Sequence, residues 1–392
     1  MRDVVIVGAA RTAIGTFGGS LKELSATDLG VIVIGEALKR AGLKPGSVDE
    51  VIMGNVLQAG LGENPARQCA VRAGIPVEVP SYTINKLCGS GLKAVALGAL
   101  AISSGESEVV VAGGTESMTN APYLLTKGRW GFRMGDETVV DSMLNDGLLD
   151  AFSHVHMGIT AENLAERFKI GREEQDAFAN ESIRRALAAI EQQAFREEIV
   201  PIEIPQKRGS PFIFDVDEFP RTRPAPEAMA GLRPAFKKDG TVTGGTASGI
   251  SDGAAAVVLM AREKAEAEDV APLARIRAYA TAGVDPQIMG TGPIAAVKKV
   301  LEKTGLSIDE IDLVESNEAF AVQALCVAKA LKFKPERTNI NGGAVALGHP
   351  IGASGCRLLV TLLYGMKRLD KHVGLATLCI GGGQGIAMVV ER

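Results

Sequence analysis

The chain has 392 residues, more than a single hydrophobic core usually supports, so we expect two or three domains. Its formal net charge is −4, and no basic block interleaved with aromatic residues occurs, which argues against nucleic acid as a partner. The five cysteines form an odd set without a Cys-x-x-Cys motif, which argues against a disulfide framework and against a metal site.

The start of the sequence leads directly into a strand pattern and has no signal-peptide layout. We also find no uninterrupted run of eighteen apolar residues. We therefore expect a cytoplasmic protein without a membrane partner, although a transit peptide that has been removed would leave no trace.

The first 120 residues alternate strand and helix patterns. Residues 4–7 and 48–55 read as strands, residues 27–41 as a helix that stops at Gly42, and residues 109–114 as a further strand. Strands that alternate with helices are typical of α/β proteins with a largely parallel sheet.

Between two of these strands lies the segment Asn85-Lys-Leu-Cys88-Gly-Ser-Gly. It is followed by residues 92–102, which are nearly all Ala, Leu, Val, Gly or Ile and predict a helix buried on all sides. Cys88 would sit at the N-terminus of that helix, where the dipole favours a thiolate, so we expect a lowered thiol pKa. A packed core cysteine is the commoner role for a free Cys.

The middle of the chain differs from the two ends in composition and in its predicted elements. Residues 120–160 carry the only Trp, Trp130, and read as a surface excursion; residues 161–198 predict two amphipathic helices broken at Ile170-Gly171. Residues 205–247 are rich in Pro, Arg, Lys and Gly, and the core pattern resumes at Ser248. We interpret this middle as an irregular domain inserted into the first half.

An internal repeat organises the rest. Three segments of the first half resemble three segments of the second half in the same order. Residues 41–55 resemble 304–317, residues 88–91 resemble 352–355, and residues 109–114 resemble 375–382. Two copies of one α/β unit predict that their two apolar helices pack together between two sheets.

Glycine-rich turns follow several strands, but none completes a dinucleotide or phosphate-loop motif. Such turns also let backbone N–H groups face an oxyanion. By the repeat, His349 falls near the helix turn that corresponds to the one bearing Cys88, which would join a thiol and an imidazole as nucleophile and base. Cys379 and Asn317 lie at the ends of predicted strands, where core packing or a turn role is the plainer alternative.

Four ordered motifs resemble the thiolase family over essentially the whole chain: Asn85-Lys-Leu-Cys88-Gly-Ser-Gly, Asn317-Glu-Ala-Phe320, Gly348-His349-Pro-Ile-Gly and Cys379-Ile-Gly-Gly-Gly. The resemblance implies two α/β halves in a five-layer αβαβα core with an inserted loop domain, assembled as a homotetramer. We expect residues 1–118 with 249–270 to form the N-terminal half, 119–248 the loop domain for CoA binding and tetramer contacts, and 271–392 the C-terminal half.

The resemblance also assigns roles. Cys88 would be the acylated nucleophile, His349 its base, and Cys379 the acid/base for the second substrate. The N–H groups of Gly381 and Cys88 would form one oxyanion hole, and His349 with a water held by Asn317 the other. Acetyl-CoA, acetoacetyl-CoA and CoA would be the substrates, without a metal or another cofactor.

The middle domain resembles the family's coenzyme A cradle. The residues that match its pantetheine and acyl pocket are Leu148, His156, Met157, Phe236, Ser248, Met289 and Phe320, and Arg221 matches a position near the nucleotide end. A solvated loop charge is the alternative for His156 and Arg221. Trp130 and its neighbours match the loop that makes tetramer contacts.

His156-Met157 and Cys88-Gly-Ser-Gly-Leu resemble the biosynthetic short-chain branch, which joins two acetyl-CoA molecules. The alternatives are a degradative 3-ketoacyl-CoA thiolase and, in a different class, a thiolase-like lipid-binding or assembly protein that has lost a reactive residue. Thr246 and Lys86 depart from residues common in the family, which affects pocket details. Two thiols at one site would also be open to oxidative coupling.

Overall fold

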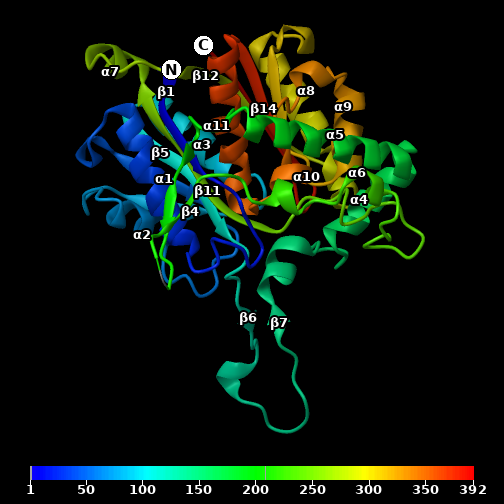
Figure 1. Cartoon of the computed structure of the whole chain (residues 1–392). Helices are drawn as coiled ribbons and strands as arrows, with labels where there is room; N and C mark the ends of the chain where they lie inside the picture. The colour runs from blue at the N-terminus through cyan, green and yellow to red at the C-terminus, as the bar shows by residue number, and fades with distance from the viewer. Residues whose placement is uncertain (1, 208) are drawn as a thin grey trace.

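The computed structural model describes residues 2–207 and 209–392, and the side chain of Arg221 lies outside the description. Both halves of the chain contribute to one mixed sheet, ordered β13-β14-β15-β12-β1-β11-β5-β3-β4 (Figure 1). Its strands are β1 (Val4–Thr12), β3 (Glu50–Gly54), β4 (Ser81–Ile84), β5 (Val109–Ser117), β11 (Ser251–Ala261), β12 (Ala274–Gly283), β13 (Leu313–Ser316), β14 (Val373–Ile380) and β15 (Gln384–Glu391), with the short β2 (Gly15–Thr16) and β8 (Ile199–Val200) at its side.

The strand order confirms the internal repeat. In the first half it runs β1-β11-β5-β3 and in the second β12-β15-β14-β13, and the two half-sheets join where β1 pairs with β12 at Val5 and Ile6. An aspartate occupies the corresponding position before β3 and before β13. Asp49 Oδ2 accepts from the Val109 N–H at 2.9 Å, and Asp312 Oδ2 accepts from the Val373 N–H at 3.0 Å. Each aspartate thereby fixes the first residue of the neighbouring strand.

The expectation of a largely parallel sheet was wrong. The β3–β5 and β13–β14 pairs are parallel, but β1–β11, β11–β5, β12–β15 and β14–β15 are antiparallel. The physical reason is the way in which the chain enters the antiparallel strands β11 and β15. The chain reaches β11 by way of the insertion, and it enters β15 through the tight turn at residues 381–383, so neither follows a crossover helix.

Helices cover and fill this frame. They are α1 (Ala26–Ala41), α2 (Pro65–Arg72), α3 (Ser90–Ser104), α7 (Arg262–Ala267), α8 (Gly292–Thr304), α9 (Ala321–Leu331), α10 (Ala344–Leu347) and α11 (Ile351–Leu369), with 3₁₀ turns η1 (Pro45–Ser47), η5 (Pro286–Thr291), η6 (Ile308–Glu310) and η7 (Pro335–Arg337). Ser25 and Asp28 form a capping box at the start of α1, and Gly42 ends it in the left-handed conformation.

The two apolar helices α3 and α11 pack against each other, as the repeat predicted. They approach so closely that a β-carbon on Gly91 would lie 2.9 Å from the backbone nitrogen of Cys356. The segment Leu87–Ser104 is apolar and long enough to cross a membrane by composition, and in the fold it is this core helix. Burial on all sides holds for its first turns, whereas Leu100 near its end is 49% exposed.

The insertion leaves the sheet after β5 and returns at β11. It contains a thin arm that projects from the body (Figure 1), built from β6 (Tyr123–Leu124), η2 (Gly128–Trp130) and β7 (Val140–Asp141). The two predicted amphipathic helices are present as α4 (Met157–Phe168) and α5 (Arg172–Glu191). The remaining elements are the π-helical η3 (Met143–Leu148), β9 (Ile202–Ile204), β10 (Phe212–Phe214), η4 (Phe219–Thr222) and α6 (Pro226–Met229).

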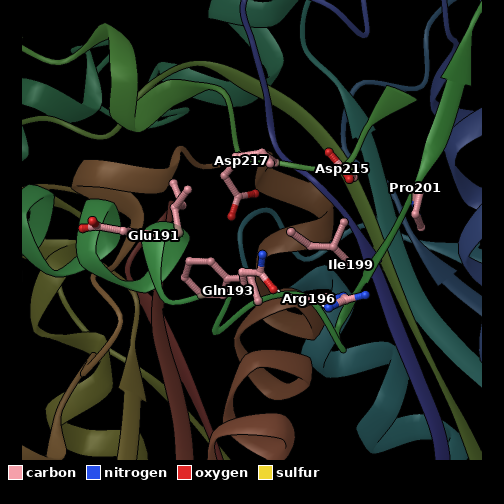
Figure 2. Close-up of a pocket in the computed structure, with 10 residues that line it drawn as sticks. Glu191, Gln193, Arg196, Ile199, Pro201, Asp215 and Asp217 are labelled. Atoms are coloured by element: carbon pink, nitrogen blue, oxygen red, sulfur yellow. Dashed lines mark hydrogen bonds between the residues drawn. The ribbon is translucent and has the colours of Figure 1, made fainter. Parts of the chain in front are cut away.

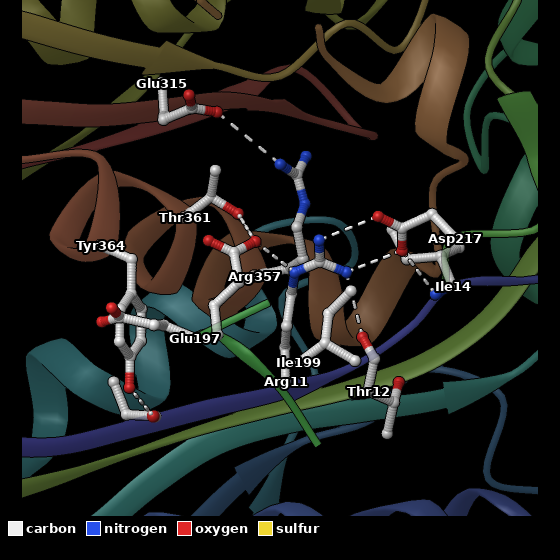
Figure 3. A network of polar contacts seen from close by, with 12 residues as sticks. Arg11, Thr12, Ile14, Glu197, Ile199, Asp217, Glu315, Arg357, Thr361 and Tyr364 are labelled. Atoms are coloured by element: carbon white, nitrogen blue, oxygen red, sulfur yellow. Dashed lines mark hydrogen bonds and ion pairs between the residues drawn. The ribbon is translucent and has the colours of Figure 1, made fainter. Parts of the chain in front are cut away.

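A buried group of charged side chains fastens the insertion to both halves (Figure 3). Arg11 of β1 donates through Nε to Glu198 at 2.6 Å and through Nη1 and Nη2 to Asp217 at 2.7 and 2.9 Å. Thr361 Oγ1 of α11 donates to Glu198 Oε1 at 2.9 Å, which joins the insertion to the second half, and Arg357 of α11 lies 3.7 Å from Glu315 of β13 in the same region. Removing one partner of such a buried pair typically costs about 3–5 kcal/mol, so this group holds the three parts in one arrangement.

Candidate active site

One cavity of about 280 Å³ joins the residues that the sequence singled out. Its wall includes Cys88, His349, Cys379 and Gly381, and Asn317 lies behind His349. Seven of the predicted binding residues also line it: Leu148, His156, Met157, Phe236, Ser248, Met289 and Phe320. The eighth, Arg221, has no described side chain. Residues from both halves and from the insertion therefore meet at one place.

A rigid turn between β4 and α3 presents Cys88. Leu87 adopts a left-handed conformation with φ of 47°, and its N–H donates to Asn85 Oδ1 at 2.9 Å. Ser90 Oγ accepts from the Lys86 N–H at 2.8 Å and donates to the Leu87 carbonyl at 2.7 Å. These bonds, made by residues of one short motif, fix the backbone on both sides of the thiol.

The expectation of an acidic Cys88 thiol was wrong. Burial raises the pKa of the Cys88 thiol to about 11, and the nearby carboxylate of Glu116 adds to the rise. The N–H groups of Gly381 and of Cys88 itself donate to the sulfur and lower the pKa, but by less than burial raises it. In the resting protein the thiol is therefore protonated at neutral pH, and its ionisation requires a base.

His349 is held in one tautomer by Ser354. Its Nδ1 lies 2.6 Å from Ser354 Oγ, and that oxygen lies 2.9 Å from the carbonyl oxygen of Pro350. A carbonyl only accepts, so the single hydroxyl proton points to Pro350 and the His349 Nδ1–H donates to Ser354. Nε2 is then the unprotonated nitrogen. Burial, with a smaller contribution from Arg357, lowers the pKa of His349 to about 3, so the imidazole is neutral and able to accept a proton.

Asn317 and Cys379 come from the ends of the neighbouring parallel strands β13 and β14. The Asn317 N–H donates to the Thr377 carbonyl at 3.0 Å, and its Nδ2 lies 3.4 Å from His349 Nε2. Its Oδ1 is buried and has no hydrogen-bond partner among the described residues. Burial, together with the neighbouring Cys88, raises the pKa of the Cys379 thiol far above its usual range.

Aromatic side chains close the far wall of the cavity. The ring of His156 stacks on Phe236 with centroids 4.7 Å apart, and Phe236 meets Phe320 edge to face at 5.9 Å. His156 is also the N-cap of α4, where its Nδ1 accepts from the Gly158 N–H at 3.0 Å. The wall is therefore apolar and fixed in position, which limits the space for a group attached at Cys88.

Two family models together account for nearly the whole chain. The thiolase N-terminal domain matches residues 4–263, and the thiolase C-terminal domain matches residues 270–392. The chain belongs to the thiolase family.

This thiolase has full-length relatives of high similarity. The acetyl-CoA acetyltransferase of Pseudomonas aeruginosa is 58% identical over 392 residues, and that of Escherichia coli is 57% identical over 393 residues, each match covering 100% of both chains. The crystal structure of the Bacillus anthracis acetyl-CoA acetyltransferase matches with a TM-score of 0.97 and 48% identity, covering 100% of this chain and 99% of that one. The predicted thiolase fold is thereby confirmed.

Two buried carboxylates of the thiolase site were missed by the sequence reasoning. Glu116 accepts hydrogen bonds from the N–H groups of Val56, Leu57 and Gly352 at 3.1, 3.1 and 2.9 Å, which ties the start of α11 to the first half. Burial raises the pKa of Glu116 to about 7. The only available signal was an acidic residue near the end of β5, shortly after the apolar run Val109–Ala112.

Glu318, the neighbour of Asn317, is the second. It accepts from Ser182 Oγ at 2.7 Å and from Asn339 Nδ2 at 2.8 Å. These bonds hold the strand end that carries Asn317. The sequence analysis assigned roles to Asn317 and Phe320 of this motif but none to Glu318.

A larger cleft of about 690 Å³ lies elsewhere, between the end of α5 and the segment before η4 (Figure 2). Its lining contains neither cysteine nor histidine. The carboxylate of Asp217, which faces it, is already taken by Arg11 and by the Ile14 N–H at 2.8 Å. The chemistry of acyl transfer therefore favours the smaller cavity at Cys88. Among residues 2–207 and 209–392, no group of three His, Cys, Asp or Glu side chains is arranged to hold a metal ion.

Proposed function

We propose that this thiolase is an acetyl-CoA C-acetyltransferase, which condenses two acetyl-CoA molecules to acetoacetyl-CoA and CoA and catalyses the reverse cleavage. The observation that supports it best is the meeting of Cys88, His349 and Cys379 in one cavity with the Gly381 N–H directed at the Cys88 sulfur. The names of the full-length relatives support the same activity.

In the first half-reaction, the Cys88 sulfur attacks the acetyl carbonyl as its proton passes to His349 Nε2. The raised pKa of the thiol and the lowered pKa of the imidazole favour a transfer that accompanies the attack, because a free thiolate-imidazolium pair would be costly. The N–H groups of Gly381 and Cys88 stabilise the oxyanion. The bond to CoA breaks, and the departing thiolate takes up the proton of Cys379, which leaves acetyl-Cys88, free CoA, a Cys379 thiolate and a His349 that keeps the Cys88 proton on Nε2.

In the second half-reaction, Cys379 as thiolate removes a proton from the methyl group of the second acetyl-CoA. The Nε2–H of the protonated His349, together with a water held by the unpartnered Oδ1 of Asn317, stabilises the enolate oxygen. The carbanion attacks acetyl-Cys88 and expels the Cys88 thiolate, which takes up the proton from His349 Nε2, while Cys379 keeps the proton from the methyl group, so the resting state is restored. Acetyl-Cys88 cannot ionise, so a Cys88 thiolate, one cause of the high Cys379 pKa, cannot form at this stage.

The wall around Phe236 supports a short acyl group, and we assign acyl and pantetheine contacts to Leu148, His156, Met157, Phe236, Ser248, Met289 and Phe320. Arg221 keeps its expected role near the nucleotide.

We propose no cofactor beyond the CoA thioesters. The domain division at residues 118, 248 and 270 and a cytoplasmic location also stay proposals, the latter supported by five free thiols.

We propose a homotetramer, with the arm of residues 119–141 as a contact between copies. Trp130 is 85% exposed and Met134 is 98% exposed at its tip, where a monomer would leave apolar surface in water.

The test is CoA-dependent cleavage of acetoacetyl-CoA by the wild type and by Cys88→Ala, with a long-chain 3-ketoacyl-CoA in parallel. Cleavage confined to the short substrate and lost in the variant supports the proposal. Equal rates on the long chain assign the protein to the degradative branch. Absence of Cys88-dependent cleavage of either substrate refutes a catalytic role.

A further inference from the structure

Arg223 follows η4 and lines the same cavity as Cys88, although it was not among the predicted site residues. Its guanidinium carbon lies 4.8 Å from the centre of the Phe219 ring, which also lines the cavity. The segment 219–223 therefore forms a wall of the cavity that presents one cationic side chain.

Part of that guanidinium is used by the protein. Nη1 donates to the Gly244 carbonyl at 3.1 Å, and Nη2 donates to the carbonyls of Gly245 and Ala247, the latter at 3.3 Å. These bonds close the loop that leads to Ser248. The two terminal nitrogens are therefore occupied by neutral acceptors.

The rest of the guanidinium is not satisfied. Nε is buried and has no hydrogen-bond partner, and no carboxylate forms an ion pair with Arg223 in the described parts of the chain. Burial lowers the pKa of Arg223 to about 10, which still leaves it charged at neutral pH. A partly desolvated cation without a counter-charge is unfavourable by itself and favourable once an anion arrives.

We infer that Arg223 is a binding residue for a phosphate group of the CoA substrate, an inference that rests on the proposed function. The thioester and pantetheine parts of CoA are uncharged, so only its phosphates supply the missing negative charge. The guanidinium is suited to this task because it remains charged and offers a fixed N–H direction. Arg223 thus has two tasks: it closes the loop at residues 244–247 and neutralises a phosphate.

The experiment measures cleavage of three acetoacetyl thioesters by the wild type and by Arg223→Gln: those of CoA, of dephospho-CoA and of pantetheine. We expect KM for the CoA ester to rise about tenfold in the variant, the effect of one charge-assisted contact, with kcat and the pantetheine ester within twofold of the wild type. An equal rise for the dephospho-CoA ester identifies the diphosphate as the contact, and a rise for the CoA ester alone identifies the 3′-phosphate.

Arg196→Gln, which removes the same charge from an exposed site away from the cavity, serves as the matched control and should leave all three esters unchanged. Arg223→Lys keeps the charge and should retain most of the affinity for the CoA ester. Equal losses on all three esters in Arg223→Gln, or a fall in kcat alone, would show that Arg223 acts only on the loop. A wild type inactive on acetoacetyl-CoA would refute the proposed function itself, whereas an active wild type with an unaffected Arg223→Gln would refute this inference alone.

Discussion

The hydroxyl oxygen of Ser354 lies 2.6 Å from Nδ1 of His349 and sets which imidazole nitrogen carries the proton. Ser354 is the repeat partner of Ser90, whose hydroxyl fixes the turn before Cys88. One serine position thus serves the nucleophile in the first half and the base in the second.

Replacing Ser354 by Ala should lower kcat about tenfold, because His349 loses the hydrogen bond that selects its tautomer, worth about 1 kcal/mol or more. KM should change little, since Ser354 does not line the cavity. Steady-state kinetics over a range of pH, with Ser354→Thr as the conservative variant that restores the hydroxyl, measure this. A variant with the wild-type kcat and pH profile would show that the tautomer is set by other means.

Alkylation of Cys88 in the free enzyme should be slow at pH 7 and should accelerate with each pH unit beyond pH 8.5. The thiolate is the reactive form, and burial raises the pKa of Cys88 to about 11. The rate of iodoacetamide modification, followed by mass spectrometry of the Cys88 peptide, measures it, with Cys88→Ser correcting for the other thiols. A rate that levels off below pH 8 would mean that a thiolate exists before substrate binds.

Glu116 should give the stability a specific pH dependence. Its folded-state pKa of about 7 lies above the usual 4.5, so its contribution is fully present below pH 4.5 and is lost as the pH rises through 7. The stability advantage of the wild type over Glu116→Gln, from urea unfolding, should therefore be largest near pH 4.5 and shrink by pH 8. A difference that grows with pH would contradict the direction of the shift.

Phe236→Ala should widen the acyl space, since the Phe236 ring stacks on His156 and meets Phe320. We expect kcat/KM for a six-carbon 3-ketoacyl-CoA to rise severalfold relative to that for acetoacetyl-CoA. Phe168→Ala, at a 40% exposed ring in α4, is the control. An unchanged ratio would place the limit on chain length elsewhere.

Replacing both Trp130 and Met134 by Ser should disrupt contacts between copies while leaving each site intact. The arm lies outside the cavity, so light scattering after gel filtration should show a smaller assembly that retains activity. A wild type that is already monomeric would refute the tetramer.

The sequence reasoning predicted the repeat, the packed apolar helices and the meeting of Cys88, His349 and Cys379, because these depend on periodicity and on motifs a few residues long. It was wrong about the acidity of Cys88, since the number of atoms surrounding a thiol is set by the insertion and by β14, far away in the chain. It missed Glu116 and Glu318 for a related reason: their partners lie 21 to 236 residues away and become visible only in the folded chain.

In the proposed mechanism the site takes its parts from all three segments of the chain: the nucleophile from the first half, the imidazole and second thiol from the second half, and the acyl wall largely from the insertion. Catalysis is therefore a property of the docked whole, and an isolated half would have no turnover even if it folded. In refolding experiments, recovery of activity should follow the final docking of the halves, later than the recovery of secondary structure. The recovery of enzymatic activity therefore measures the completion of the tertiary structure.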